Sequence, residues 1–410
     1  MKITEEISTP VTEQCDVLVC GGGFGGISAA LAAAREGKKV VLLEKQYILG
    51  GLGTAGLVTI YLPLCDGFGR QVSFGIAEEL LRVSVSMGAE ARYPANWLDS
   101  TDLSMRTAAH SRFETQFNPH LFAILAERLL LEAGVRILYG TYAVAVRRSG
   151  SRIEAVMIEN KSGRQAVQAA SVIDATGDAD IAFFAGVPTE TFQQGNLLAA
   201  WYYFYGKAGY DLRMLGFCDI PEEQKTAQNT IETLEDRRFT GLDGAEISQF
   251  MQLSHLSVLN DVKKQRQKDP SLIPVTIASI PQLRMTRRLC GEYTLQDKEM
   301  HTFFSDSVGM VSDWRKRGPV YEVPFRTLYH ASCKNLIMAG RCTSVTESMW
   351  DIMRVIPCCA VTGQAAGTAA AMTSDFSALD IGSLQRRLKK NGVILHESEL
   401  AFPAVKEEIK

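Results

Sequence analysis

A glycine-rich stretch near the N-terminus has the residue types and the spacing that bind phosphate. Gly21-Gly-Gly23-Phe-Gly-Gly26 fits the pattern G-x-G-x-x-G and follows a short apolar run, Asp16-Val-Leu-Val-Cys20. In this pattern the first glycine permits a tight turn, the second lets a pyrophosphate approach the backbone, and the third lets a helix pack closely on a strand. The N-terminus of that helix offers free N–H groups and a positive dipole end to phosphates. We therefore expect a dinucleotide to bind here, and the alternative is a Gly-rich turn without a ligand.

An acidic residue follows at the distance that dinucleotide-binding folds require. Glu44 ends the next apolar run, 18 residues after Gly26. A carboxylate at this position accepts hydrogen bonds from ribose hydroxyls. A 2′-phosphate on that ribose would place two negative charges together, so Glu44 argues against a ligand that carries one. These residues do not distinguish NAD from FAD.

Three further segments combine small residues with charges at the ends of apolar runs, and they bear on the choice between NAD and FAD. The segments are Lys45-Gln-Tyr-Ile-Leu-Gly50-Gly51-Leu-Gly-Thr54-Ala-Gly56, then Asp174-Ala-Thr-Gly-Asp178, then Asn335-Leu-Ile-Met-Ala-Gly340-Arg341, which precedes Arg354-Val-Ile-Pro-Cys-Cys-Ala-Val-Thr-Gly363-Gln-Ala-Ala-Gly367.

Together with the glycine stretch, these segments resemble the two-dinucleotide-binding-domain flavoproteins, the broad group that resembles glutathione reductase and fumarate reductase. Within it, the chain is similar to the bacterial FAD-dependent oxidoreductase family, which reads nearly the same through D-A-T-G-D, N-L-x-x-A-G-R-C and G-Q-A-A-G-x-A-A-A. The resemblance covers most of the chain and is weakest around residues 85–110 and 190–275. It implies FAD as cofactor and hydride transfer between flavin and a small organic substrate. A flavoprotein with non-redox chemistry of isomerase or lyase type, or a non-catalytic FAD-binding protein, stays open as an alternative.

The resemblance also implies a set of cofactor-binding residues. Small residues end the strand before Asp178, which lets a cofactor lie against the backbone. The last long helix is expected to begin near Pro357, a favoured first-turn residue, and its dipole would stabilise negative charge on reduced flavin. The alternative is an ordinary packing helix of small residues. The expected set is Gly21, Gly23, Phe24, Gly25, Gly26, Glu44, Lys45, Gly50, Gly51, Thr54, Ala143, Ala175, Thr176, Gly177, Asp178, Gly340, Arg341, Pro357 and Cys359.

Two features of related flavoproteins are missing from the sequence. Disulfide reductases of the group carry a C-x₄-C pair shortly after Gly50-Gly51, where this chain has only Cys65. No second G-x-G-x-x-G marks a separate NAD(P)H domain, so NADH and NADPH are not expected to be efficient direct reductants. Cys358 and Cys359 are adjacent at a helix start, where thiolates can be stabilised, although packing is the favoured interpretation of this pair.

Candidates for the chemistry lie in a basic element of the second half of the chain. Residues 281–293 resemble the family element P-Q-x-R-E-T-R-R-x-x-G-E-Y, with Met285 in place of its Glu. The guanidinium groups of Arg287 and Arg288 suit a carboxylate or phosphate of a substrate, and the alternative is that both form structural salt bridges. The predicted catalytic residues are Arg287, Arg288, His330 and Arg341, with His110 and Tyr321 as weaker candidates.

The elements that must position these residues alternate between strands and helices. Residues 16–20 and 39–43 read as strands on either side of a helix at 27–36, and this order predicts a parallel sheet. The expected fold is α/β: a Rossmann-like FAD/NAD(P)-binding domain with a parallel central sheet and an inserted mixed α+β substrate domain. We expect a discontinuous FAD-binding domain of residues 12–70, 110–189 and 325–373, a substrate or cap domain of residues 190–324 with 71–109, and a C-terminal helical tail at 374–410.

Composition and the length of the apolar runs limit the classes of partner that we expect the chain to bind. The 410 residues carry a net charge of −3, without the basic excess of nucleic-acid binders, and no C-x-x-C pair indicates a metal site. The longest apolar run, residues 197–205, is far shorter than the ~20 residues that cross a bilayer, and the N-terminus lacks the apolar core of a signal peptide. We expect a cytoplasmic protein with reduced cysteines and a small-molecule substrate, which the arginines would allow to be anionic, and no nucleic-acid or membrane partner. Homo-oligomer formation is left open.

Overall fold

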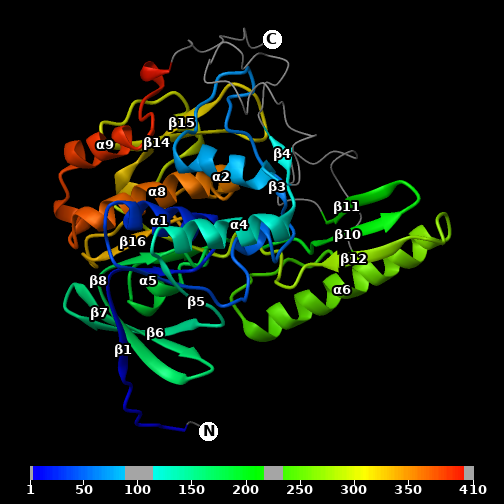
Figure 1. The fold of residues 1–410 in the computed structure, drawn as a ribbon, viewed down its shortest axis with the longest axis horizontal. Coiled ribbons are helices and arrows are strands. Elements are labelled where there is room, and N and C mark those ends of the chain that lie inside the picture. The colour runs from blue at the N-terminus through cyan, green and yellow to red at the C-terminus, as the bar shows by residue number, and fades with distance from the viewer. Residues whose placement is uncertain (1–2, 88–113, 217–233, 401–410) are drawn as a thin grey trace.

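A mostly parallel sheet forms the centre of the molecule, which the computed structural model describes for residues 3–87, 114–216 and 234–400 (Figure 1). The strand order is β5-β2-β1-β8-β7-β6, and β16 also pairs with β8. β1, β2, β5, β8 and β16 run parallel, whereas β6 and β7 continue the sheet in antiparallel fashion. The strands are β1 (Val11–Cys20), β2 (Val40–Leu43), β5 (Arg136–Leu138), β6 (Tyr142–Ser149), β7 (Arg152–Asn160), β8 (Gly163–Asp174) and β16 (Leu336–Met338).

The register of the parallel strands brings their carboxyl ends to one edge. Cys20 at the end of β1 lies opposite Leu43 at the end of β2 and opposite Asp174 at the end of β8. Met338, which ends β16, also lies opposite Asp174. Ligands of open α/β sheets bind at this edge, so the segments that follow these strands are placed to form a site.

Two helices with small residues cover one face of the sheet. α1 (Phe24–Arg35) and α8 (Ile356–Met372) lie side by side there, with α4 (Pro119–Glu132) and α2 (Ile76–Val85) around them (Figure 1). A Cβ atom on Gly363 would overlap the backbone of Gly25, and one on Gly367 would overlap that of Ala29. Only glycine at these two positions allows the helices to approach so closely. Asn118 caps α4 by accepting hydrogen bonds from two backbone N–H groups of its first turn.

The central strands bury side chains on both faces, as alternation along β1 shows. Val17 and Val19 join the core on the α1 and α8 side, whereas Leu18 and Cys20 face the opposite core. That second core is closed by β6, β7 and α5 (Asp180–Phe184). Burial on both faces explains why the strands read as continuous apolar runs in the sequence.

Part of the predicted substrate domain projects from this body. A three-stranded sheet of β10 (Ala200–Gly206), β11 (Gly209–Leu215) and β12 (Ile273–Ile277) packs on the long helix α6 (Gly244–Arg266) (Figure 1). In contrast, β14 (Ser307–Ser312) and β15 (Val320–Pro324), which the prediction also placed in that domain, contribute side chains to the main core beside α8. The predicted domain boundaries stay a prediction.

The remaining elements are short connections around the body. The strands are β3 (Ile60–Tyr61), β4 (Thr115–Gln116), β9 (Thr189–Thr191) and β13 (Arg287–Leu289), the helices are α7 (Glu347–Met353) and α9 (Ile381–Lys390), and short 3₁₀ turns lie at Gly51–Gly53, Asp297–Glu299, Phe325–Thr327, Phe376–Ala378 and Glu397–Glu399.

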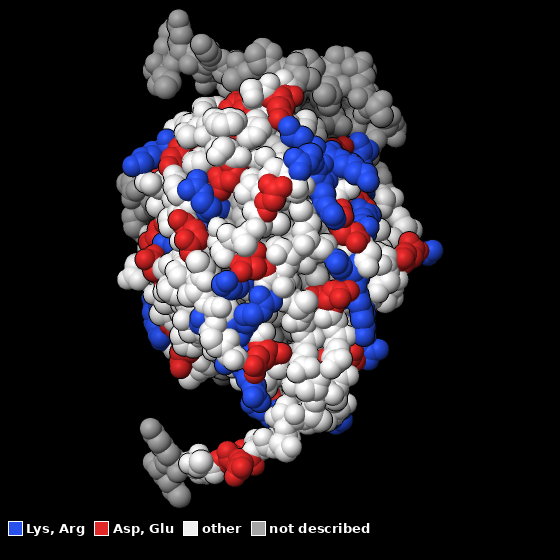
Figure 2. Space-filling view, turned by 90° about the vertical axis from the view of Figure 1, so that its left-hand side faces the viewer, with Lys and Arg blue, Asp and Glu red and all other residues white. Residues whose placement is uncertain are grey.

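The structure confirms the expected α/β class with its mostly parallel sheet. Among the elements whose positions the sequence predicted, α1 and β2 begin and end within three residues of the expected bounds, and α8 begins one residue before Pro357. β1 starts five residues earlier than expected, so Cys15 lies within it. All cysteines in the described part of the chain are free. On the face shown in Figure 2, Lys and Arg side chains are interspersed with Asp and Glu. In residues 3–87, 114–216 and 234–400, no single helix has the length and apolar composition to cross a membrane. α7 and α8 have this length and composition only when they are taken together, and the pair is bent by 88°.

Candidate functional site

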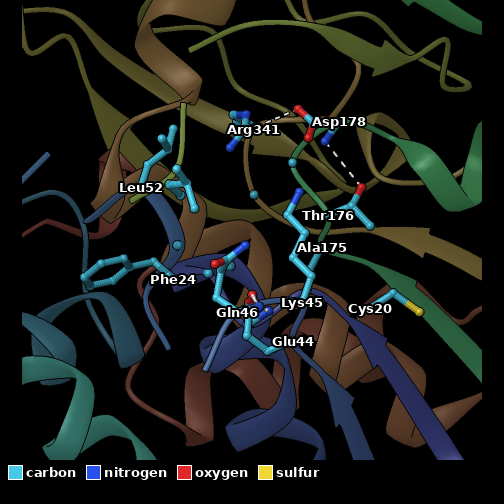
Figure 3. Close-up of a pocket in the computed structure, with 18 of the residues that line it drawn as sticks. Cys20, Phe24, Glu44, Lys45, Gln46, Leu52, Ala175, Thr176, Asp178 and Arg341 are labelled. Carbon is cyan, nitrogen blue, oxygen red and sulfur yellow. Dashed lines mark hydrogen bonds and ion pairs between the residues drawn. The ribbon is translucent and has the colours of Figure 1, made fainter. Parts of the chain in front are cut away.

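A cavity of about 400 Å³ opens where the carboxyl ends of the parallel strands meet α1, α8 and the projecting part (Figure 3). Sixteen of the expected cofactor-binding residues lie on its wall. They are Gly21, Gly23, Phe24, Gly25, Glu44, Lys45, Gly50, Gly51, Ala143, Ala175, Thr176, Gly177, Asp178, Gly340, Arg341 and Cys359. Gly26, Thr54 and Pro357 lie behind the wall instead.

The glycine turn has the geometry that its motif predicts. Gly21 has a φ of +113°, and a Cβ there would collide with the backbone of Ala175. A Cβ on Gly23 would meet no atom within 4 Å, so the backbone is open to the cavity at the position where a pyrophosphate must approach. A Cβ on Gly26 would collide with the carbonyl of Gly21, which explains why this third glycine packs the helix and does not reach the cavity. The turn therefore forms a cradle that fits a pyrophosphate.

Glu44 connects the end of β2 to the glycine turn. Its carboxylate accepts hydrogen bonds from the backbone N–H of Gly22 at 2.8 Å and of Gln46 at 2.7 Å, one on each oxygen. Burial raises the pKa of this carboxyl group, and the two hydrogen bonds and Lys45 partly offset that rise. Each oxygen keeps lone-pair capacity for a further donor, so the cavity-facing carboxylate suits a ribose hydroxyl.

The loop after Glu44 is held in place by buried side chains. Thr54 donates its hydroxyl to the carbonyl of Leu49 at 2.5 Å and thereby closes the loop from behind. A Cβ on Gly53 would overlap the ring of Phe24, which itself stacks on Phe122 at 4.4 Å between centroids. Thr54 therefore supports the wall and does not form part of it.

The segment after β8 carries a buried carboxylate. Asp174 is fully buried, and it accepts hydrogen bonds from the backbone and hydroxyl of Thr176 and from the backbone of Ala182 in α5. Burial raises the pKa of Asp174 to about 6, against the lowering effect of these hydrogen bonds. Asp174 therefore shapes the turn from behind, and the residues after it reach the cavity.

Asp178 and Arg341 form an ion pair on the cavity wall, with Nη2 of Arg341 2.6 Å from Oδ1 of Asp178 (Figure 3). Burial alone would raise the pKa of Asp178, but the charges of Arg341 and Lys45 and the hydrogen bonds that it accepts lower it instead. Gly177 has a φ of +79°, and a Cβ there would lie 2.5 Å from Nη1 of Arg341. Glycine at 177 therefore leaves the space that the guanidinium occupies.

The first turn of α8 closes another part of the wall. Ile356 and Cys359 face the cavity, whereas Pro357 and Cys358 are buried behind it. The thiol of Cys359 lies 3.3 Å from the carbonyl of Arg354, and burial raises its pKa to about 12. The side chain of Cys359 is therefore a neutral wall residue, which agrees with packing as the favoured interpretation.

The predicted catalytic residues divide between the wall and the surrounding body. Arg341 lines the cavity, whereas Arg287, Arg288 and His330 do not. Arg287 bonds to the carbonyl of Asp178 and pairs with Asp180 at 2.7 Å. The ion pairs of Arg287 and Arg288 correspond to the structural alternative given for these two arginines, and the catalytic assignment stays a prediction. Arg288 pairs with Glu190, His330 bonds to Ser332, the hydroxyl of Tyr321 donates to the carbonyl of Asp297, and His110 lies outside the described residues.

Several wall residues were not predicted. Arg354, whose Nε donates to Asp351 at 2.9 Å, faces the cavity beside α8. The projecting part adds apolar side chains to the wall. Two of them, Pro281 and Leu283, belong to the basic element of residues 281–293, in which the sequence predicted site roles only for arginines. Among the remaining unpredicted residues, Gly22, Gln46 and Leu52 lie within the quoted motif segments, whereas Thr141, Tyr142, Gly241, Ile247 and Ile280 follow no motif and reach the wall through the tertiary fold.

The sheet, the glycine cradle and Glu44 define a dinucleotide-binding α/β protein. Residues 16–200 and 202–388 match the model of the FAD dependent oxidoreductase family. The chain belongs to that family, and its cofactor is FAD.

The chain is also similar to named relatives over shorter stretches. It is 32% identical over 79 residues to a thioredoxin reductase of Ureaplasma parvum, a match that covers 19% of this chain and 26% of that protein. It is 44% identical over 62 residues to the NADH:acrylate oxidoreductase of Vibrio harveyi, covering 15% of this chain and 6% of that protein. The chain thus spans about a quarter or less of the length of these relatives. A solved geranylgeranyl bacteriochlorophyll reductase-like protein of Thermoplasma acidophilum aligns over 92% of this chain and 83% of its own, with 15% identity and a TM-score of 0.46.

Proposed function

We propose that the protein is an FAD-dependent oxidoreductase that transfers a hydride between bound flavin and a small organic substrate. Family membership supports the redox class. The observation that carries the proposal is one continuous cavity, lined by Glu44, the start of α1, the start of α8 and the projecting part. At one end, Glu44 can accept hydrogen bonds from a ribose, and at the other end the wall is apolar. An elongated dinucleotide with a substrate beside it requires both.

The chain's own residues hold the cofactor and neutralise its charge. The open backbone at Gly23 and the N-terminus of α1 receive the pyrophosphate, and Glu44 binds the adenosine ribose. The start of α8, where Ile356 and Cys359 reach the wall, places a positive dipole end beside the cavity. When bound, FAD supplies a ring that takes up or releases two electrons, and the protein supplies orientation and electrostatics.

The far wall excludes water and selects the substrate. Ile247, Ile280, Pro281 and Leu283 present apolar side chains to the cavity. We extend the proposal to an anionic substrate, which the cation Arg354 on the wall beside the start of α8 supports. For location we propose the cytoplasm, on the sequence alone.

Anaerobic photoreduction of the purified protein tests the redox proposal. After the flavin is bleached, candidate acceptors with a small carboxylate-bearing carbon skeleton are added, and the return of flavin absorbance is followed. Saturable reoxidation, faster than that of free photoreduced FAD at the same concentration, supports the proposal. A flavin that no acceptor reoxidises faster than this control contradicts it and favours non-redox or purely binding roles. NADH and NADPH serve as donors in a parallel experiment and should bleach the flavin only slowly.

A further inference from the structure

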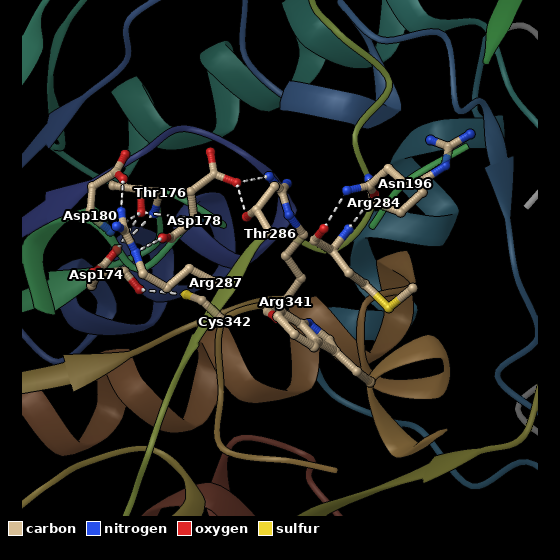
Figure 4. Close-up of polar contacts among 12 residues, drawn as sticks. Asp174, Thr176, Asp178, Asp180, Asn196, Arg284, Thr286, Arg287, Arg341 and Cys342 are labelled. Atoms are coloured by element: carbon tan, nitrogen blue, oxygen red, sulfur yellow. Dashed lines mark hydrogen bonds and ion pairs between the residues drawn. The ribbon is translucent and has the colours of Figure 1, made fainter. Parts of the chain in front are cut away.

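One oxygen of Asp178 joins two parts of the chain that are far apart in sequence. Oδ1 accepts a hydrogen bond from the hydroxyl of Thr286 at 2.6 Å and another from Nη2 of Arg341 at 2.6 Å (Figure 4). Arg341 follows β16 and lies on the cavity wall, whereas Thr286 directly precedes β13 and does not reach the cavity. Because both donors share one acceptor atom, a displacement of one of them changes the position available to the other.

Thr286 is itself held firmly by its surroundings. It is 1% exposed, and its carbonyl accepts a hydrogen bond from the backbone N–H of Phe192 at 2.8 Å. Its methyl group packs beside Gly241, where a Cβ would lie 2.9 Å from Cγ2. Pro281 and Leu283, which line the cavity, precede Thr286 on the same segment. The hydroxyl therefore belongs to the same stretch of chain as the apolar wall.

Arg341 carries a donor that nothing in the described residues satisfies. Its Nε is buried and has no hydrogen-bond partner there, although Nη2 is bound to Asp178. The preceding residue, Gly340, lies against the first turn of α1, because a Cβ on Gly25 would be 2.9 Å from its Cα. A buried N–H without a partner costs free energy, and a helix N-terminus attracts phosphate. Both features favour an anion in the cavity beside Arg341.

We propose that Thr286 is a positioning residue for the FAD pyrophosphate. Through Asp178 it holds Arg341 against the phosphates, and it thereby links cofactor binding to the segment 281–286 that forms part of the substrate wall. Arg287 does not share this role, because it bonds to the carbonyl of Asp178 and to Asp180, not to the carboxylate of Asp178. The inference concerns cofactor binding and does not depend on the redox reaction proposed above.

Isosteric substitution isolates the hydroxyl of Thr286. Thr286→Val removes the donor and keeps the shape, whereas Thr286→Ser keeps the donor. The matched control is Thr343→Val, because Thr343 is equally buried and its hydroxyl has no partner among the described residues. FAD dissociation constants are measured on the apoprotein by flavin fluorescence, and urea unfolding of each apoprotein checks the fold. We expect about tenfold weaker binding for Thr286→Val, nearly wild-type binding for Thr286→Ser and no change for Thr343→Val.

A double-mutant cycle with Arg341→Met distinguishes positioning from a merely structural effect. If Thr286 acts through Arg341, Thr286→Val weakens FAD binding in the wild-type background and has no further effect in the Arg341→Met background. Hydrogen exchange adds a second readout, because FAD should slow exchange in the segment 281–286 of the wild type and not in Thr286→Val. The proposal is overturned by wild-type affinity in Thr286→Val, by an equal loss in the Arg341→Met background, or by equal FAD protection of the segment in both proteins.

Discussion

Gly363 of α8 lies directly against the carbonyl oxygen of Gly25 in α1, so close that a Cβ on Gly363 would overlap it. Gly25 belongs to the turn that forms the phosphate cradle, and it also contacts Gly340 beside Arg341. The packing of α8 on α1 therefore sets the position of the cofactor site.

Substituting Gly363 should consequently weaken both the fold and cofactor binding. In Gly363→Ala the added methyl must push α8 away from α1, and overpacking of this kind destabilises proteins by about 1–3 kcal/mol. The first turn of α1 moves with it, so FAD should bind less tightly. Gly244→Ala is the control, because a Cβ at Gly244 meets nothing within 4 Å. Urea unfolding and FAD titration measure both effects, and a Gly363→Ala protein as stable as Gly244→Ala would contradict the packing argument.

Glu44 should contribute to both cofactor affinity and stability. Loss of charge-assisted hydrogen bonds to the ribose, at roughly 1.5–3 kcal/mol, should make FAD binding about 10- to 150-fold weaker in Glu44→Ala. The structure adds a second effect, because the backbone N–H groups of Gly22 and Gln46 lose their acceptor. The apoprotein should therefore be less stable than the wild type.

Glu44→Gln is the informative comparison for this prediction. It keeps one acceptor oxygen but turns an amide N–H towards a backbone N–H, so its affinity and stability should both fall between wild type and Glu44→Ala. Turnover at saturating FAD should change little in either variant, because Glu44 is expected to bind the adenosine end. Unchanged FAD affinity in Glu44→Ala would mean that the ribose is bound elsewhere.

The sequence predicted the part of the site that follows from local spacing. The glycine turn, Glu44 and Gly177 each come directly after a strand, and the register of a parallel sheet then brings them together. The substrate wall could not be predicted in this way, because Ile247 and Ile280 reach the cavity only through tertiary packing of segments without a motif. The arginine of the cavity wall could not be predicted with certainty of place either, because residue type alone does not tell which of several arginines near Asp178 faces the cavity.

The buried carboxyl group of Asp174 should make stability depend on pH. Its pKa is about 6 in the folded protein, against an ordinary value of 3.8, so the folded state binds the proton more tightly than the unfolded chain. The contribution of Asp174 to the free energy of unfolding should therefore fall as the pH rises from about 4 to 6, by up to roughly 3 kcal/mol, and lose this dependence above that range. Urea denaturation of the apoprotein measures it, with Asp174→Asn as the non-titrating comparison. Parallel pH profiles for the two proteins would contradict this assignment.

Cys359 should be an unreactive thiol despite its place on the cavity wall. Burial raises its pKa from 9.0 to about 12, which lowers the thiolate fraction near neutral pH by about a thousandfold, and the thiolate is the nucleophile. Iodoacetamide should therefore modify Cys359 far more slowly in the folded apoprotein than in urea, as measured by mass spectrometry of the peptide that contains it. FAD should slow the reaction further, because it fills the cavity. Cys333, which is buried away from this cavity, provides the internal control, since FAD should leave its rate unchanged. Rapid modification of Cys359 in the folded apoprotein would show that the thiol is ionised there.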